Sequence, residues 1–152
     1  MTKVGEHITL DIIGTTKEYD PSLYEKVIKE IAKAADVTIL NISKYKFEPQ
    51  GCTILALLAE SHISFHTFPE KGIISFDFFT CAKVSPKVAL DILKKEINHE
   101  RAVVKNFDRS TVSLYNDIYS TPGQKKYYVV NNVLDSFTSK VGQFVEVLNL
   151  EV

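Results

Sequence analysis

The sequence contains no tryptophan, one methionine and only two cysteines among its 152 residues. It has no apolar run near the roughly 20 residues that a membrane-spanning helix needs, and its first residues lack the apolar core of a signal peptide. The chain also has no large excess of charge of either sign, because its 18 Lys and Arg residues are balanced by 19 Asp and Glu residues. No basic run is interleaved with aromatic residues, as nucleic-acid binding would require. We therefore expect a cytoplasmic protein with neither a membrane nor a nucleic-acid partner.

Cysteine scarcity limits the redox chemistry of the chain. The two cysteines, Cys52 and Cys81, could form one disulfide, but the thiol pool of the cytoplasm would keep them reduced. We expect a buried or a reactive thiol at each position.

Apolar residues make up 45% of the chain, enough for one globular domain with its own core. Period-two alternation and turn residues predict strands, and Asp20-Pro21 and Ser85-Pro86 each mark a helix start. Strands are expected at 5–14, 37–47, 53–59, 61–68, 73–80 and 101–107, and helices at about 21–35 and from Ser85 to Ile97. This order predicts an α+β fold, a two-layer sandwich of an antiparallel β-sheet with helices on one face.

The last part of the chain carries no recognisable chemistry. Two further strands are expected at 126–134 and 141–150, after a turn signal at Thr121-Pro122-Gly123. We interpret residues 1–109 as the core and residues 110–152 as a β-rich extension of the same domain, without an assigned role.

A predicted hairpin brings two reactive side chains together. If Phe68 faces Ile73 across the turn, Ser61 lies opposite Thr80 and beside Cys81. His66 lies five residues farther along the strand, roughly 16 Å from Ser61. A shared site would need a bent strand or a second copy of the chain, and a twofold dimer provides that copy and duplicates the site.

A zinc site of His62, His66 and Cys81 is not expected. Two histidines four residues apart on a strand are separated by about 13 Å, whereas zinc ligands lie about 2.0 to 2.3 Å from the metal. The sequence thus predicts no metal.

Several short motifs follow one another in a specific order between residues 4 and 109. They are Gly5-Glu6-His7, Phe47-Glu48-Pro49-Gln50-Gly51, Glu60-Ser61-His62, His66-Thr67-Phe68-Pro69-Glu70 and Phe78-Phe79-Thr80-Cys81. Each of these residues taken alone has an ordinary structural explanation, but their joint order resembles the S-adenosylmethionine decarboxylase proenzyme family of bacteria and archaea. The resemblance implies self-cleavage between Glu60 and Ser61, followed by conversion of Ser61 into a pyruvoyl cofactor.

The resemblance also implies roles for individual residues. Ser61 would attack the Glu60 carbonyl to form an ester, and His66, aided by the Thr53 hydroxyl, would remove the proton that allows elimination. The substrate amine would form a Schiff base with the pyruvoyl group, and Cys81 would return a proton after decarboxylation. Phe47, Phe68 and Glu70 resemble the residues that bind the adenine and ribose of S-adenosylmethionine. The product would supply aminopropyl groups for spermidine synthesis.

Three departures from the family pattern leave alternatives open. Thr53 replaces a usual serine, Phe68 a usual tryptophan, and Ala82 a common glycine. One alternative is a pyruvoyl decarboxylase that acts on L-ornithine or L-arginine. The other is an uncleaved homologue that regulates an active decarboxylase.

Overall fold

The computed structural model describes residues 4–15 and 17–109. This part of the chain contains six strands, two α-helices and two short 3-10 turns. The elements are β1 (Glu6–Ile13), α1 (Pro21–Ala35), β2 (Ile39–Lys46), β3 (Cys52–Leu58), β4 (Ser61–Phe68), η1 (Pro69–Lys71), β5 (Ile73–Thr80), η2 (Pro86–Val88), α2 (Ala89–Glu96) and β6 (Arg101–Asp108).

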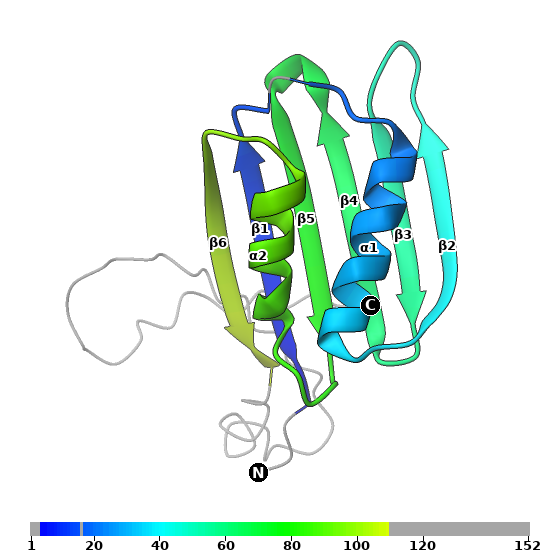
Figure 1. Cartoon of the computed structure of the whole chain (residues 1–152), viewed down its shortest axis with the longest axis vertical. Helices are drawn as coiled ribbons and strands as arrows, with labels where there is room; N and C mark the ends of the chain where they lie inside the picture. The colour runs from blue at the N-terminus through cyan, green and yellow to red at the C-terminus, as the bar shows by residue number, and fades with distance from the viewer. Residues whose placement is uncertain (1–3, 16, 110–152) are drawn as a thin grey trace, which may run out of the picture. The chain divides into compact units, whose positions relative to one another are not determined.

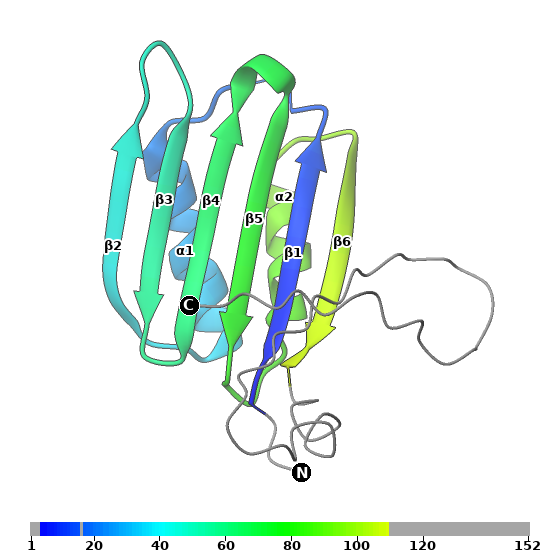
Figure 2. The ribbon, with the colours of Figure 1, turned by 180° about the vertical axis from the view of Figure 1, so that it is seen from behind.

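The strands form one antiparallel sheet in the order β2-β3-β4-β5-β1-β6. Both helices lie against the same face of this sheet (Figure 1), and the view from behind shows the strands in front of them (Figure 2). The predicted α+β sandwich is therefore confirmed. We call the sheet face without helices the open face.

The core lies between the sheet and the helices. Every second residue of the central strands is buried there, as the alternation of apolar and polar residues requires. Phe65 lies in the middle, with its ring centroid 5.1 Å from that of Tyr24 on α1 and 4.9 Å from that of Phe76 on β5. Aromatic packing thus ties α1 to β4, and Phe65 in turn contacts β5.

The helix α1 begins and ends as its sequence predicts. The Asp20 side chain accepts a hydrogen bond from the Ser22 amide at 2.8 Å, and Pro21 takes the first helical position. The second helix starts differently, because Ser85 caps the 3-10 turn Pro86–Val88 before α2 begins at Ala89. Both helices are thus confirmed, the second with a tighter first turn and an end one residue before Ile97.

The central hairpin has the predicted bounds and register. β4 and β5 pair with Ser61 opposite Thr80 and Phe68 opposite Ile73. The other strands shift at their ends by one or two residues: β1 covers Glu6–Ile13 rather than 5–14, β2 Ile39–Lys46 rather than 37–47, β3 Cys52–Leu58 rather than 53–59, and β6 Arg101–Asp108 rather than 101–107. The strands expected at 126–134 and 141–150 lie outside the described residues, as does the rest of the extension.

Among the residues that the structure describes, no helix has the length and apolar character needed to cross a membrane.

Candidate active site

The peptide bond predicted to be cut lies in the tight turn between β3 and β4. Leu58 pairs with Ser61, so that Ala59 and Glu60 alone form the connection. The turn is tied to the segment between α1 and β2, because the Ala59 amide donates to the Thr38 carbonyl at 3.0 Å. The Thr38 amide in turn donates to Glu60 Oε2 at 2.8 Å. Both backbone and side-chain contacts therefore hold the predicted cleavage junction in place.

Ser61 has a strained backbone. Its φ angle is +146°, in a region that residues with a side chain rarely adopt. Such conformations cost on the order of 1–3 kcal/mol each and persist only where the surrounding structure enforces them. The strain falls on the residue immediately after the predicted cleavage site.

The Glu60 carbonyl oxygen has two donors from a single residue. The Cys81 amide donates to it at 3.1 Å, and Cys81 Sγ lies 3.4 Å from the same oxygen. This arrangement confirms the predicted proximity of Cys81 to the Glu60-Ser61 junction. Donors aimed at a carbonyl oxygen stabilise the negative charge that develops there during nucleophilic attack.

The two cysteines differ in environment. Cys81 is exposed, whereas Cys52 is buried and accepts a hydrogen bond from the Thr67 hydroxyl at 3.5 Å. Burial raises the pKa of the Cys52 thiol. Both cysteines are free, so Cys81 is the accessible thiol and Cys52 belongs to the core.

His66 and Thr53 form a second polar pair on the open face. Thr53 is opposite His66 in the β3–β4 pairing, and Thr53 Oγ1 lies 3.0 Å from His66 Nδ1. Both His66 and Ser61 belong to the continuous strand β4, which confirms the predicted separation of roughly 16 Å along the strand. Within one chain, the structure does not bring His66 to Ser61.

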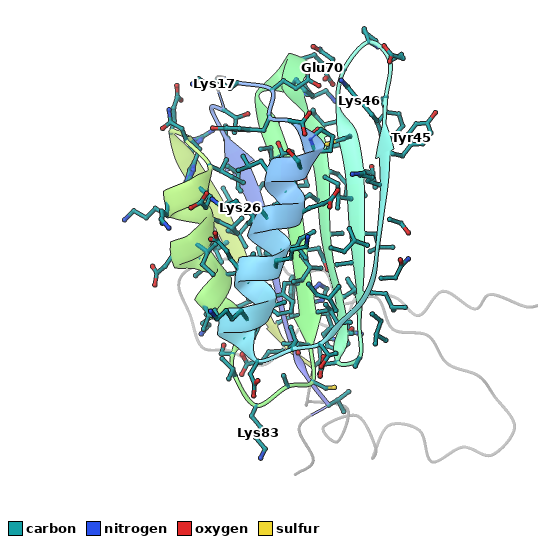
Figure 3. The ribbon with its side chains drawn as sticks, turned by 45° about the vertical axis from the view of Figure 1, so that its right-hand side comes forward. Lys17, Lys26, Tyr45, Lys46, Glu70 and Lys83 are labelled. Atoms are coloured by element: carbon teal, nitrogen blue, oxygen red, sulfur yellow. The ribbon has the colours of Figure 1, made fainter. Side chains whose placement is uncertain are left out.

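The three predicted substrate-binding residues lie at the His66 end of β4. Phe68 ends that strand, Glu70 follows in η1, and Phe47 comes directly after β2. Figure 3 shows Glu70, Tyr45 and Lys46 toward one end of the sheet and Lys83 at the other end. Phe47 is half-exposed and packs edge-on against Tyr45, with ring centroids 4.9 Å apart. The predicted residues thus form two groups, at opposite ends of β4.

Three further polar side chains, His62, His7 and Asp77, lie near Ser61. From the sequence, the two histidines were named only within motifs or as a rejected zinc ligand, and Asp77 was not identified. Asp77 Oδ1 is 2.8 Å from His62 Nε2, and Asp77 Oδ2 is 2.7 Å from His7 Nε2. His62 Nδ1 is 3.4 Å from Ser61 Oγ. The sequence did carry a signal, because Asp77 is the one charged residue in the middle of strand β5.

The same three side chains also have the composition of a metal-ligand set. The ligand atoms of His7, His62 and Asp77 all lie within 4.8 Å of one another. The set considered and rejected from the sequence was a different one, in which His62 and His66 are four residues apart on β4. The strand placement on which that rejection rested is confirmed.

Comparison with known proteins points to one family. The sequence model described as S-adenosylmethionine decarboxylase matches residues 6–110, more than half of the chain. The chain belongs to the S-adenosylmethionine decarboxylase family. The predicted resemblance is therefore confirmed over the whole described sheet and both helices.

Individual relatives of this family come from bacteria and archaea. An S-adenosylmethionine decarboxylase proenzyme of Prochlorococcus marinus (strain MIT 9313) is 40% identical over 111 residues, which cover 71% of this chain and 89% of that protein. One from Methanococcus vannielii is 35% identical over 117 residues, covering 75% and 96%. A crystal structure of the adenosylmethionine decarboxylase from Aquifex aeolicus VF5 matches with a TM-score of 0.66 and 31% identity, covering 74% of this chain and 95% of that one.

Proposed function

We propose that this chain cuts itself between Glu60 and Ser61 and that the product is a pyruvoyl-dependent decarboxylase of S-adenosylmethionine. The observation that carries the proposal is the strained Ser61 beside a carbonyl held by the Cys81 amide. Family membership supports the same conclusion, since the relatives are named proenzymes of this decarboxylase. The product would serve spermidine synthesis as an aminopropyl donor.

The residues around the junction suit the formation of the cofactor. Attack by the Ser61 hydroxyl on the Glu60 carbonyl would relieve the strain at Ser61 and convert the amide into an ester. Elimination then requires a base at the α-carbon of Ser61, which is the role proposed for His66. The Thr53 hydroxyl, 3.0 Å from His66 Nδ1, would orient that ring. Thr53 therefore retains the hydroxyl contact that the usual serine would make, which weakens the hypothesis of an uncleaved homologue.

A pyruvoyl group at Ser61 would act as the electron sink for decarboxylation. The Cys81 thiol, which lies at the same junction, would donate a proton to the α-carbon of the product. An aromatic face and carboxylate acceptors suit a nucleoside, so Phe47, Phe68 and Glu70 would bind the adenosine part. We expect these three residues to select S-adenosylmethionine over L-ornithine and L-arginine.

A homodimer would unite the two ends of β4 in one site. His62, Ser64, His66 and Phe68 alternate onto the open face, which also carries exposed apolar residues such as Leu55 and Leu57, 47% and 53% exposed. A second copy packed on this face about a twofold axis would place its His66 near the first copy's Ser61. Each site would then take Ser61 and Cys81 from one protomer, and His66, Thr53 and the nucleoside-binding residues from its partner.

The test of the proposed function is the intact mass of freshly purified protein under denaturing and reducing conditions. We expect two chains, residues 1–60 and residues 61–152, with a ketone-reactive N-terminus on the second. A Ser61→Ala variant should remain one chain and release no carbon dioxide, whereas Ser43→Ala, at an exposed position on β2, should behave as the wild type.

A wild-type chain that stays intact would instead identify an uncleaved regulatory protein. Carbon dioxide release from S-adenosylmethionine, L-ornithine and L-arginine should be compared under the same conditions. A preference for either amino acid would replace the proposed substrate but retain the pyruvoyl chemistry.

A further inference from the structure

A continuous chain of polar contacts leads from Ser61 into the open face. Ser61 Oγ lies 3.4 Å from His62 Nδ1, and His62 Nε2 lies 2.8 Å from Asp77 Oδ1. The other carboxylate oxygen of Asp77 lies 2.7 Å from His7 Nε2. The order of groups is a hydroxyl, an imidazole, a carboxylate and a second imidazole.

The contacts with Asp77 determine which nitrogen of His62 is free to accept a proton. A carboxylate only accepts hydrogen bonds, so each Nε2 atom that contacts Asp77 must carry a hydrogen. A neutral His62 then has its lone pair on Nδ1, the atom that faces Ser61 Oγ. His7 Nδ1 lies 3.4 Å from Arg109 Nη1 and accepts from that guanidinium in the same way. Arg109 thus orients His7, and His7 holds the second oxygen of the Asp77 carboxylate.

Sheet register makes this arrangement rigid. His62 and His7 occupy one row across the sheet, with Phe79 between them, and Asp77 is in the next row of β5. The ring centroid of Phe79 lies 6.2 Å from that of His62 and 5.6 Å from that of His7. Side chains placed by three paired strands lose little freedom when they are arranged for catalysis.

We propose that His62 is the base that accepts the Ser61 hydroxyl proton in the first step of self-cleavage, and that Asp77 and His7 position it. The inference rests on the proposed function, because it assigns a residue to the processing reaction. His66 is poorly placed for this step within its own chain, since it lies five residues away along β4 and contacts Thr53. Two histidines then serve two successive proton transfers.

The step balances without any added reactant. Ser61 Oγ forms a bond to the Glu60 carbonyl carbon while its proton moves to His62 Nδ1. The resulting oxyanion is held by the Cys81 amide. The bond between the carbonyl carbon and the Ser61 nitrogen then breaks, and His62 returns the proton to that nitrogen. The products are an ester on Ser61 Oγ and a free amine on Ser61, with no net gain or loss of protons.

The experiment separates ester formation from elimination with hydroxylamine, which cleaves esters. The full chain is made by cell-free translation, so that variants are observed from the start of processing. A His66→Ala variant should accumulate the ester and be cut by hydroxylamine at Ser61. A His62→Gln/His66→Ala double variant should form the ester at least about 100-fold more slowly, because loss of a general base typically costs about 10²- to 10⁴-fold. Equal hydroxylamine cleavage of the two variants would overturn the proposal.

Two further variants test whether slower ester formation arises from the loss of a proton acceptor or from a disturbed fold. Asp77→Asn in the His66→Ala background keeps His62 but replaces one of the two carboxylate acceptors with an amide donor and removes the negative charge, so that the tautomer of His62 is no longer fixed. We expect ester formation to slow by about 10-fold or more. Circular dichroism should show the same fold for every variant. His99→Gln, in which the lost histidine contacts only the Ile97 carbonyl among the interactions described, is the matched control and should process as the wild type. Unchanged ester formation in the Asp77 variant would contradict the positioning role.

Two outcomes distinguish failure of the proposed role of His62 from failure of the proposed function. A wild-type chain that never cleaves would remove the proposed function, whereas a His62→Gln chain that cleaves at the wild-type rate would remove only this inference. Loss of processing on chelation, with recovery on adding Zn²⁺, would also overturn it, because His7, His62 and Asp77 would then be metal ligands.

Discussion

At the scale of the residue, Cys81 contributes to the site through two different groups. Its amide and its thiol both approach the Glu60 carbonyl, at 3.1 and 3.4 Å. Only the thiol depends on the identity of the side chain, because any residue other than proline would supply the amide. The proposed roles of Cys81 in processing and in decarboxylation can therefore be separated by substitution.

We expect Cys81→Ala to retain self-cleavage and to lose most of its decarboxylase activity. The amide that stabilises the oxyanion remains, whereas the proton donor for the product is removed, a change that costs about 10²- to 10⁴-fold for a general acid. Intact mass measures the first effect and carbon dioxide release from S-adenosylmethionine measures the second. Loss of cleavage in parallel with loss of activity would show that the thiol, not the amide, acts on the Glu60 carbonyl.

Residue patterns predicted part of the site and missed the rest for a physical reason. Ser61 and Cys81 were placed correctly by hairpin register, which depends only on local pairing, whereas the association of Thr53 with His66 was implied only by the family resemblance. His7 was quoted only as part of a motif, because its contact with Asp77 depends on the pairing of β1 with β5, which are far apart in sequence. The contact of Asp77 with His62 lies within the predicted hairpin and was overlooked. The charge of Asp77 within a strand that has no other charged residue was the available signal.

At the scale of the element, predictions succeeded where turn chemistry and periodicity agree. The bounds of α1 follow from Asp20 and Pro21, and those of β4 and β5 follow from the turn that joins them. The predicted bounds of an element are wrong where contacts between residues distant in sequence determine its end. The turn at Ala59 and Glu60 shortens β3 because it is bonded to Thr38, a contact across 22 residues that periodicity cannot reveal.

The packing of α1 against α2 includes an ion pair that provides a test of pH dependence. Lys26 Nζ on α1 donates to Glu96 Oε2 on α2 at 2.9 Å. This hydrogen bond, followed by the one from Lys95, lowers the pKa of Glu96. A carboxyl group whose pKa is lowered on folding stabilises the fold above its unfolded pKa, and that contribution is lost as the pH falls through the folded pKa.

We therefore expect Glu96→Gln to reduce the free energy of unfolding at pH 7 by a small amount and to have less effect near pH 3. The comparison uses urea unfolding in a Ser61→Ala background, in which the chain remains in one piece. Glu48→Gln, in the exposed loop before β3, is the matched control and should change little at either pH. A difference between Glu96→Gln and its parent that grows as the pH falls would contradict the role of this pair.

At the scale of the whole molecule, the proposed site residues fall into two groups at opposite ends of β4, each of which would be one half of a site. Ser61 and Cys81 lie at one end, and His66, Phe68 and Glu70 lie at the other. A twofold axis through the middle of the face would pair each half-site with the complementary half of a second copy. The proposed dimer therefore predicts that two defective chains can complete one site.

Co-expression of a Ser61→Ala chain with a differently tagged His66→Ala chain provides the measurement. Neither chain should be fully processed alone. In a mixed dimer, Ser61 of the His66→Ala chain would face His66 of its partner, so we expect that chain to be cleaved. A Ser61→Ala/His66→Ala chain in place of the first partner is the matched control and should give no rescue. Absence of cleavage in stable mixed dimers would show that His66 does not act across the interface.

The strand order has a consequence for the protein after the chain is cut. Cleavage before Ser61 leaves β1, α1, β2 and β3 on one peptide and β4, β5, α2 and β6 on the other. In the sheet, β1 lies between β5 and β6, and β3 remains bonded to β4. The two peptides are thus interleaved and cannot separate without breaking the sheet. Once denatured, the mature protein would have to refold by the encounter of two peptides, so its recovery would depend on concentration, unlike that of its precursor.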